Sequence, residues 1–133
     1  GRQWFGPVYV PDWIKELRPA YEGITAEIVA NLLENAFRYS SLSSSIGISI
    51  NDQGICVWDS GTPIPFSERD KIFTSGFRSS KSKEFKGSGL GLSLGQKLAE
   101  QFGGELKLIV KPSNFEESLP NEGNAFVINF PVK

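Results

Sequence analysis

The chain of 133 residues has no histidine, no methionine and a single cysteine. Without histidine, the chain cannot supply a serine–histidine–aspartate triad, a histidine general base or a histidine metal ligand. The lone Cys56 excludes an internal disulfide and a cysteine-rich metal site, and its apolar neighbours predict a small core residue in a reducing compartment. Because the chain begins with glycine and contains no methionine, we expect it to be a piece of a longer protein.

The sequence also has no large excess of charge of one sign and no long apolar run. Fourteen basic and fifteen acidic residues give a net charge of −1, which disfavours nonspecific binding to nucleic acid or to an anionic membrane. We find no signal peptide and no apolar run of about 18 residues, so we expect no membrane insertion of this domain. The hydrophobic fraction of 39% fits one compact domain over residues 1–133.

Apolar periodicity and turn residues predict an alternation of helices and strands. The predicted helices cover 12–21, 25–39, 67–73 and 90–102, and the predicted strands cover 46–50, 55–58, 105–110 and 125–130. This order indicates an α+β fold: a two-layer sandwich whose mixed, mostly antiparallel sheet carries its helices on one face. The aromatic-rich segment 1–22 is atypical, and its side chains either cover the core or form an exposed partner site.

Three alternating glycines open the helix predicted at 90–102, in the sequence Gly87-Ser-Gly-Leu-Gly-Leu92. Glycines permit close approach of backbone N–H groups to an anion, and the helix N-terminus favours negative charge. The motif therefore predicts a phosphate-binding loop. It is neither a P-loop nor a dinucleotide fingerprint, because no Gly-Lys-Ser/Thr follows and no strand precedes it. The alternative is a flexible loop before a closely packed helix.

A polar stripe runs along the helix predicted at 25–39. Since each helical residue turns by about 100°, Asn31, Glu34, Asn35 and Arg38 share one face, while apolar residues occupy most of the rest. A buried polar group without a partner costs roughly 1–3 kcal/mol, so this stripe needs partners. A ligand with its water shell would satisfy these groups, and so would neighbouring loops.

Two further polar features lie between the hairpin and the glycine motif. Asp59 ends a predicted strand and precedes the turn residues 60–65, where it either accepts a hydrogen bond from an exocyclic amine or only shapes the turn. The segment 75–88 is rich in serine and lysine, and its four basic residues between 78 and 86 match a polyphosphate or form a solvated loop.

The order and spacing of these motifs resemble the ATP-binding catalytic domain of sensor histidine kinases, in the GHKL superfamily of the Bergerat ATP-binding fold. Residues 31–40 resemble its N box, 59–65 its first glycine box, 73–78 its phenylalanine box and 87–94 its second glycine box. The resemblance covers roughly 24–102, and the closing strands also fit it.

This resemblance implies a role for each matching residue. Asn35 would be the Mg²⁺ ligand, with ATP phosphates and water completing the octahedron, and Asn31 would order that shell. Arg38 would contact phosphate, Tyr39 would lie against the nucleotide, and Asp59 would accept from the adenine amino group. Residues that would shape the base pocket, anchor the ATP lid at 75–88 or bind phosphate are Gly61, Ile64, Phe77, Lys86, Gly87, Ser88, Gly89, Leu90, Gly91 and Leu92.

The resemblance also implies a function: transfer of the ATP γ-phosphoryl group to a histidine on a separate dimerisation domain, with a response regulator downstream. The chain would then work in the cytoplasm, within a parent protein that is soluble or membrane-anchored. Alternatives are an anti-sigma-type serine kinase, a non-catalytic nucleotide-binding module, and an ATP-hydrolysing clamp in which Glu34 or Glu27 acts as base.

Three departures from the family pattern affect these expectations. Pro63 stands where the first glycine box has its second glycine, which lowers local flexibility. Asn31 stands where hydrolytic members place a glutamate, so we expect slow hydrolysis. The stretch before the N box is short, so a strand is missing or is replaced by the aromatic segment.

Overall fold

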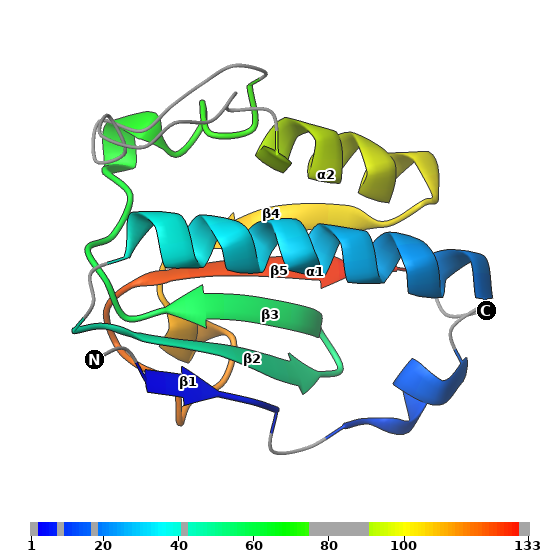
Figure 1. The fold of residues 1–133 in the computed structure, drawn as a ribbon, viewed down its shortest axis with the longest axis horizontal. Coiled ribbons are helices and arrows are strands. Elements are labelled where there is room, and N and C mark those ends of the chain that lie inside the picture. Colours follow the sequence, from blue (N-terminus) through cyan, green and yellow to red (C-terminus); the bar gives the residue numbers. More distant parts are fainter. Residues whose placement is uncertain (1–2, 8–9, 17–18, 41–42, 75–90, 131–133) are drawn as a thin grey trace.

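The computed structural model describes residues 3–7, 10–16, 19–40, 43–74 and 91–130. Within these residues, two α-helices and five strands form the framework (Figure 1). The helices are α1 (Pro19–Tyr39) and α2 (Gly91–Gln101), with 3-10 helices η1 (Asp12–Glu16), η2 (Phe66–Glu68) and η4 (Pro112–Asn114). The strands are β1 (Gln3–Phe5), β2 (Ser45–Asn51), β3 (Gly54–Asp59), β4 (Glu105–Ile109) and β5 (Asn124–Asn129).

The described strands form one mixed sheet in the order β1-β2-β3-β5-β4. β1 runs parallel to β2, and the other three pairings are antiparallel. The hairpin between β2 and β3 turns at 51–54 as predicted, and Gly54 takes a φ of 136°, which favours glycine. The α+β fold with a mostly antiparallel sheet is therefore confirmed.

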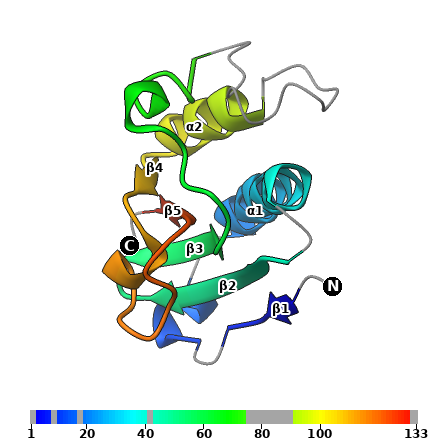
Figure 2. The same cartoon turned by 90° about the vertical axis from the view of Figure 1, so that its left-hand side faces the viewer.

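Both α-helices pack on the same face of the sheet, as predicted (Figure 2). Ile28 and Leu32 of α1 meet Val57, Leu106 and Ile128 of the strands in a buried core. Their burial is favourable by roughly 1.5–3 kcal/mol for each large aliphatic side chain, before the entropy of ordering it is subtracted.

Gly95 allows α2 to lie close to this core. A Cβ built on Gly95 would stand 3.2 Å from Leu106 Cδ2 and 3.7 Å from Ile28 Cγ2. A side chain at this position would therefore press on Leu106 of β4 and would lie in ordinary contact with Ile28 of α1.

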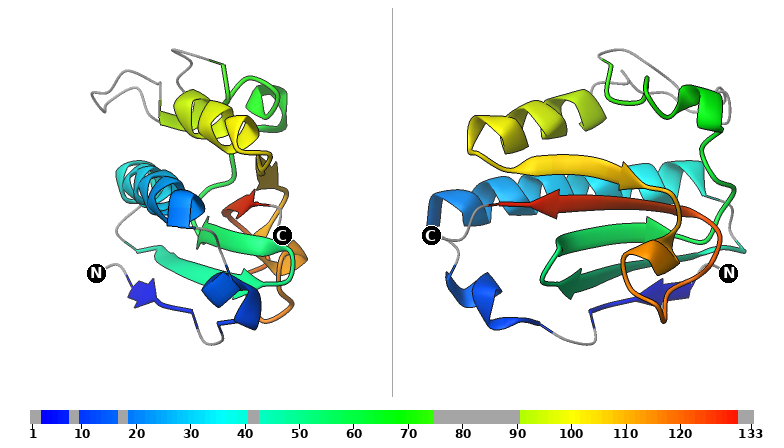
Figure 3. Two further views of the ribbon diagram at one scale, coloured as in Figure 1. Left: turned by 90° about the vertical axis from the view of Figure 1, so that its right-hand side faces the viewer. Right: turned by 180° about the vertical axis from the view of Figure 1, so that it is seen from behind.

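The opposite face of the sheet is covered by the connection from β4 to β5, residues 111–123 (Figure 3). Phe115 of this connection packs with Cys56, Trp58 and Val127 in a second buried cluster. The Asn51 side chain donates to the Phe115 carbonyl at 3.0 Å, and the Ser49 hydroxyl donates to Glu116. Cys56 is buried, which confirms the prediction of a core residue. Burial and the nearby Glu116 carboxylate raise the pKa of its thiol.

The aromatic segment supplies the fifth strand, β1. Phe5 stacks on Trp58 with ring centroids 5.9 Å apart, and Trp4 stacks on Phe37 of α1 at 6.4 Å. Trp4 and Phe37 nevertheless stay 51% and 47% exposed. The segment therefore covers the core at Trp58, as one interpretation expects, and a partner site on its exposed rings stays a prediction. Phe37 is exposed, so it does not share the buried apolar face of α1.

Two predicted helices differ from the structure. The predicted helix 12–21 corresponds to η1 and the start of α1, and Pro19 suits the first position of a helix because no N–H group is needed there. The predicted helix 67–73 is only the short η2 followed by turns, and Ser67 lies within η2, which has no side-chain cap. α1 also begins earlier than residue 25, because Tyr21 and Ile24 continue its apolar face.

In the part of the chain that the structure describes, neither helix has the length and apolarity needed to cross a bilayer.

Candidate functional site

Three element ends lie at one side of the molecule, at the left of Figure 1: the C-terminal end of α1, the end of β3 and the start of β5. The register pairs Asp59, the last residue of β3, with Asn124, the first of β5. A Cβ built on Gly61 would stand 3.4 Å from the Cβ of Ser40, directly after α1. The turn after Asp59 therefore packs against the end of α1, which carries the carboxamides of the predicted N box.

Asp59 is a buried carboxylate, only 8% exposed. Its Oδ1 accepts hydrogen bonds from the Gly61 amide at 2.8 Å and from Asn124 Nδ2 at 3.3 Å. Burying an ionised group is costly unless donors surround it, and these two N–H groups supply part of that compensation. The structure thus keeps an acceptor group at the end of a core strand, at the site where the sequence predicts recognition of an exocyclic amine.

Asn124 is the residue that the sequence reasoning missed. Its Nδ2 also donates to the Thr62 carbonyl at 3.0 Å, and its Oδ1 accepts from the Ile64 amide at 2.8 Å. It is 5% exposed. The only local signal was a polar residue at the start of an otherwise apolar strand, and nothing in that pattern names Asp59 as its neighbour.

The turn 59–65 is held from both sides. Gly61 is buried, and a Cβ there would stand 3.0 Å from Asp59 Oδ1, so its lack of a side chain lets the turn close over the carboxylate. Ile64 is half-buried and packs against the main core. Within the turn, Ser60 Oγ accepts from the Ser45 amide at 2.8 Å, which joins the turn to β2.

The predicted polar stripe lies on the last turns of α1. Asn31, Asn35 and Arg38 are half-buried, while Glu34 is exposed. Arg38 Nη2 lies 3.7 Å from Glu34 Oε1, an i,i+4 ion pair with side chains 28% and 64% exposed. Such a solvated pair is worth little, so Arg38 can exchange Glu34 for a stronger anion at small cost.

The remaining predicted residues divide into two groups. Gly91 is the first residue of α2, and Leu92 is half-buried against the core. Tyr39 is the last residue of α1. Phe77, Lys86, Gly87, Ser88, Gly89 and Leu90, and with them the predicted lid 75–88, lie outside the described residues.

Among the described residues, no group of three or more Cys, Asp or Glu side chains could form a protein cage for a cation. Mg²⁺ often takes only one or two protein oxygens and completes its octahedron with phosphates and water. A single carboxamide such as Asn35 fits that pattern.

A hollow of about 190 Å³ lies at the other end of the sheet from Asp59. Its lining residues are Trp13, Asp52, Gly54, Asn129 and Phe130. It contains none of the predicted site residues.

Comparisons with known proteins agree with the fold and with the family that the sequence resembles. Residues 22–133 match the family model described as "Histidine kinase-, DNA gyrase B-, and HSP90-like ATPase". The sensor histidine kinase Hik2 of Thermosynechococcus vestitus is 29% identical over 95% of this chain and 33% of its own length. The sensor histidine kinase YcbM of Bacillus subtilis is 33% identical over 70% of this chain and 32% of its own length.

Solved structures show the same likeness. The catalytic domain of histidine kinase ThkA has a TM-score of 0.67 and 25% identity, over 98% of this chain and 79% of that one. The mycobacterial sensor histidine kinase MprB has a TM-score of 0.68 and 23% identity, over 96% of this chain and 81% of that one. The chain spans about a third of the length of the curated relatives it matches.

Proposed function

Because the chain belongs to the family of histidine kinase-, DNA gyrase B- and HSP90-like ATPases, we propose that it is the ATP-binding catalytic domain of a sensor histidine kinase. ATP is the ligand that this family implies. The observation that carries the proposal is the buried Asp59 carboxylate, held at the end of β3 beside the C-terminal end of α1.

Asp59 reads the base in this proposal. Its carboxylate accepts a hydrogen bond from the adenine amino group, and Gly61 and Ile64 form the adjoining wall of the base pocket. A buried acceptor that is already held by protein N–H groups needs no reorganisation when the base arrives, which favours binding.

The stripe on α1 handles the phosphates. Asn35 binds Mg²⁺ through its amide oxygen, and Asn31 orders water around the ion. Arg38 exchanges its ion pair with Glu34 for one with a phosphate oxygen. Backbone N–H groups and the positive end of α2 come from the second glycine box, residues Gly87, Ser88, Gly89, Leu90, Gly91 and Leu92. In this proposal Tyr39 lies against the nucleotide, Phe77 anchors the lid and Lys86 contacts the nucleotide from the lid. When bound, Mg²⁺ neutralises phosphate charge, and the chain's residues align the γ-phosphoryl group for attack.

The phosphoryl acceptor lies outside this chain, since the chain has no histidine. We propose a histidine on a dimerisation domain of the same parent protein, followed by transfer to a response regulator. The matched part covers about a third of the length of each of these relatives, which leaves room in them for such a domain.

The test has two parts. Calorimetric titration with a non-hydrolysable ATP analogue, with and without Mg²⁺, should show binding that the metal strengthens. Labelled ATP and a separately produced acceptor domain should then give acid-labile, base-stable phosphohistidine. Acid-stable phosphoserine on the acceptor would support the serine-kinase alternative, and binding without transfer to any acceptor would support the non-catalytic module.

Hydrolysis without an acceptor is the remaining alternative, and it would need Glu34 or Glu27 as a base. Glu34 is 64% exposed and pairs with Arg38, and Glu27 is exposed too, which does not suit activation of a water molecule. A measurable rate of acceptor-free hydrolysis that Glu34→Gln abolishes would overturn this assignment.

A further inference from the structure

Asn124 is placed to control the turn that carries the adenine contact. We propose that Asn124 is a positioning residue, whose carboxamide holds both the Asp59 carboxylate and the backbone on either side of Pro63 in the geometry that binds nucleotide. The nucleotide part of this inference rests on the proposed function, but its geometric part does not.

The hydrogen-bond network determines how the carboxamide is oriented. The Ile64 amide can only donate, so it faces the Asn124 oxygen, at 2.8 Å. The Thr62 carbonyl can only accept, so it faces the Asn124 nitrogen, at 3.0 Å. That same nitrogen donates its second hydrogen to Asp59 Oδ1 at 3.3 Å. One side chain, only 5% exposed, therefore forms hydrogen bonds with a backbone amide, a backbone carbonyl and a carboxylate.

The two backbone contacts fall on either side of Pro63. Proline fixes its own φ and has no N–H group, so Pro63 cannot hydrogen-bond through its nitrogen to any part of the site. Asn124 instead binds the carbonyl before Pro63 and the amide after it. The turn gains two tertiary anchors at the position where its own backbone cannot provide a donor.

The approach of β5 to the turn depends on Gly123 as well. Gly123 has a φ of 132°, and a Cβ built there would overlap the carbonyl group of Asp59. The absence of that Cβ lets Asn124 enter β5 opposite Asp59, in register with it. The carboxamide then reaches the carboxylate from the neighbouring strand.

Two substitutions separate positioning from simple filling of space. Asn124→Ala removes all three contacts. Asn124→Asp keeps the size and an acceptor for the Ile64 amide, but it replaces the donor by an oxygen that faces Asp59 Oδ1. If Asn124 only filled space, the isosteric Asp variant would bind ATP better than the Ala variant. Because it positions Asp59, we expect the opposite order.

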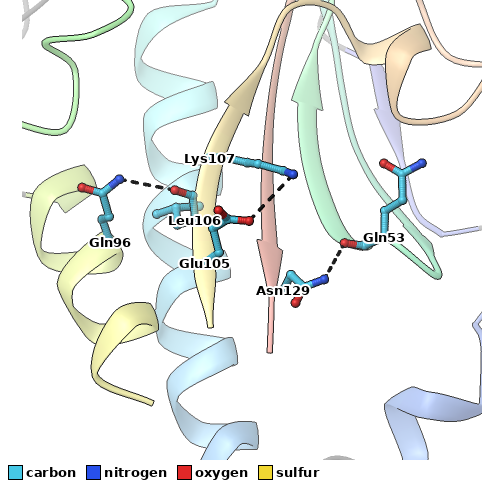
Figure 4. A network of polar contacts seen from close by, with 6 residues as sticks. All are labelled: Gln53, Gln96, Glu105, Leu106, Lys107 and Asn129. Carbon is cyan, nitrogen blue, oxygen red and sulfur yellow. Dashed lines mark hydrogen bonds and ion pairs between the residues drawn. The ribbon is translucent and has the colours of Figure 1, made fainter. Parts of the chain in front are cut away.

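Asn129→Ala is the matched control. Asn129 is the last residue of the same strand, and its Nδ2 also donates to a backbone carbonyl, that of Gln53, at 3.0 Å (Figure 4). It is exposed and lies at the far end of β5. Its substitution removes the same kind of bond without touching the turn.

The experiment combines ATP-analogue titration with amide hydrogen exchange measured by NMR on the nucleotide-free chain. Loss of the hydrogen bond to Asp59 should weaken ATP binding about tenfold in Asn124→Ala, and repulsion between carboxylates should weaken it further in Asn124→Asp. The Ile64 amide should exchange at least about tenfold faster in Asn124→Ala. Asn129→Ala should change neither quantity.

The two proposals fail in different ways. Wild-type protein that is folded but binds no ATP analogue contradicts the proposed function, and the exchange of the Ile64 amide still decides the geometric inference. Wild-type binding with unchanged affinity in both Asn124 variants contradicts positioning, as does unchanged exchange at Ile64. Thermal unfolding followed by circular dichroism shows that each variant is folded at the temperature of measurement.

Discussion

Gly123 lies directly against the backbone of Asp59, so closely that a Cβ on Gly123 would overlap the Asp59 carbonyl group. The glycine before β5 and the carboxylate at the end of β3 therefore form one packed unit. A change at Gly123 reaches the site without altering any side chain that would touch a ligand.

Gly123→Ala should destabilise the fold and displace the Asp59 turn. The new methyl group meets the Asp59 carbonyl, and alanine is strained at a φ of 132°. We expect a loss of at least about 2 kcal/mol in the free energy of unfolding, measured by urea denaturation. Gly6→Ala is the control, because nothing lies within 4 Å of a Cβ there. Equal stability of the two variants would contradict this packing.

Asp59→Asn should remove most of the affinity for ATP. The asparagine keeps an oxygen for the Gly61 amide, but its nitrogen is a donor where the adenine amino group requires an acceptor. We expect the dissociation constant measured by calorimetry to rise at least about tenfold, since an unmatched buried polar group costs about 1–3 kcal/mol. Asp52→Asn, in the exposed hairpin turn, should bind as the wild type does. An Asp59→Asn variant with unchanged affinity would mean that the base is read elsewhere.

Asn35→Ala should remove most of the increase in nucleotide affinity that Mg²⁺ produces. It should change the affinity measured without metal much less. The substitution removes the only protein oxygen that we assign to the ion. Titrations with and without Mg²⁺ should differ for the wild type and nearly coincide for the variant. Gln101→Ala, which removes an exposed carboxamide at the far end of α2, should keep the wild-type response to metal. A full metal response in Asn35→Ala would contradict the assignment.

Two helical glycines should respond in opposite ways to substitution by alanine. Gly23 lies in the exposed interior of α1 with nothing within 4 Å of a Cβ, so Gly23→Ala should stabilise the fold by roughly 0.5–1 kcal/mol. Gly95→Ala would press on Leu106, which is buried and has no room to move, and should destabilise the fold. Chemical denaturation of both variants checks the signs, and a stabilised Gly95→Ala would show that the contact between α2 and β4 is looser than described.

Stability should fall in alkaline solution because of Cys56. Burial raises the pKa of this thiol in the folded state, so above the ordinary thiol pKa of about 8.5 the unfolded chain loses a proton that the folded chain keeps. The free energy of unfolding is unaffected by this group below that pH and then decreases by up to about 1.4 kcal/mol per pH unit. Denaturation at pH 8, 9 and 10 should show a steeper decline for the wild type than for Cys56→Ala. Parallel pH profiles would show that the thiol is accessible to solvent.

Features that depend on neighbours along the chain could be predicted from the sequence. The carboxamide stripe of α1 follows from helical periodicity, and the position of Asp59 at the end of a strand follows from the apolar run before it and the turn residues after it. The hairpin at 51–54 is specified in the same way, by its turn residues. Local patterns of this kind survive in the folded chain because they reflect the geometry of single elements.

Features that depend on which elements meet were decided by the tertiary structure. The amide of Asn124 donates to the carboxylate of Asp59, 65 residues earlier in the chain, only because β3 and β5 pair in one register. The aromatic segment likewise becomes a strand because β2 offers it an edge and Trp58 offers Phe5 a stacking surface. Packing of the whole core, rather than any local pattern, specifies the hydrogen bonds between strands and the contacts between rings. The sequence therefore shows which polar and aromatic side chains are present but not which residues they contact.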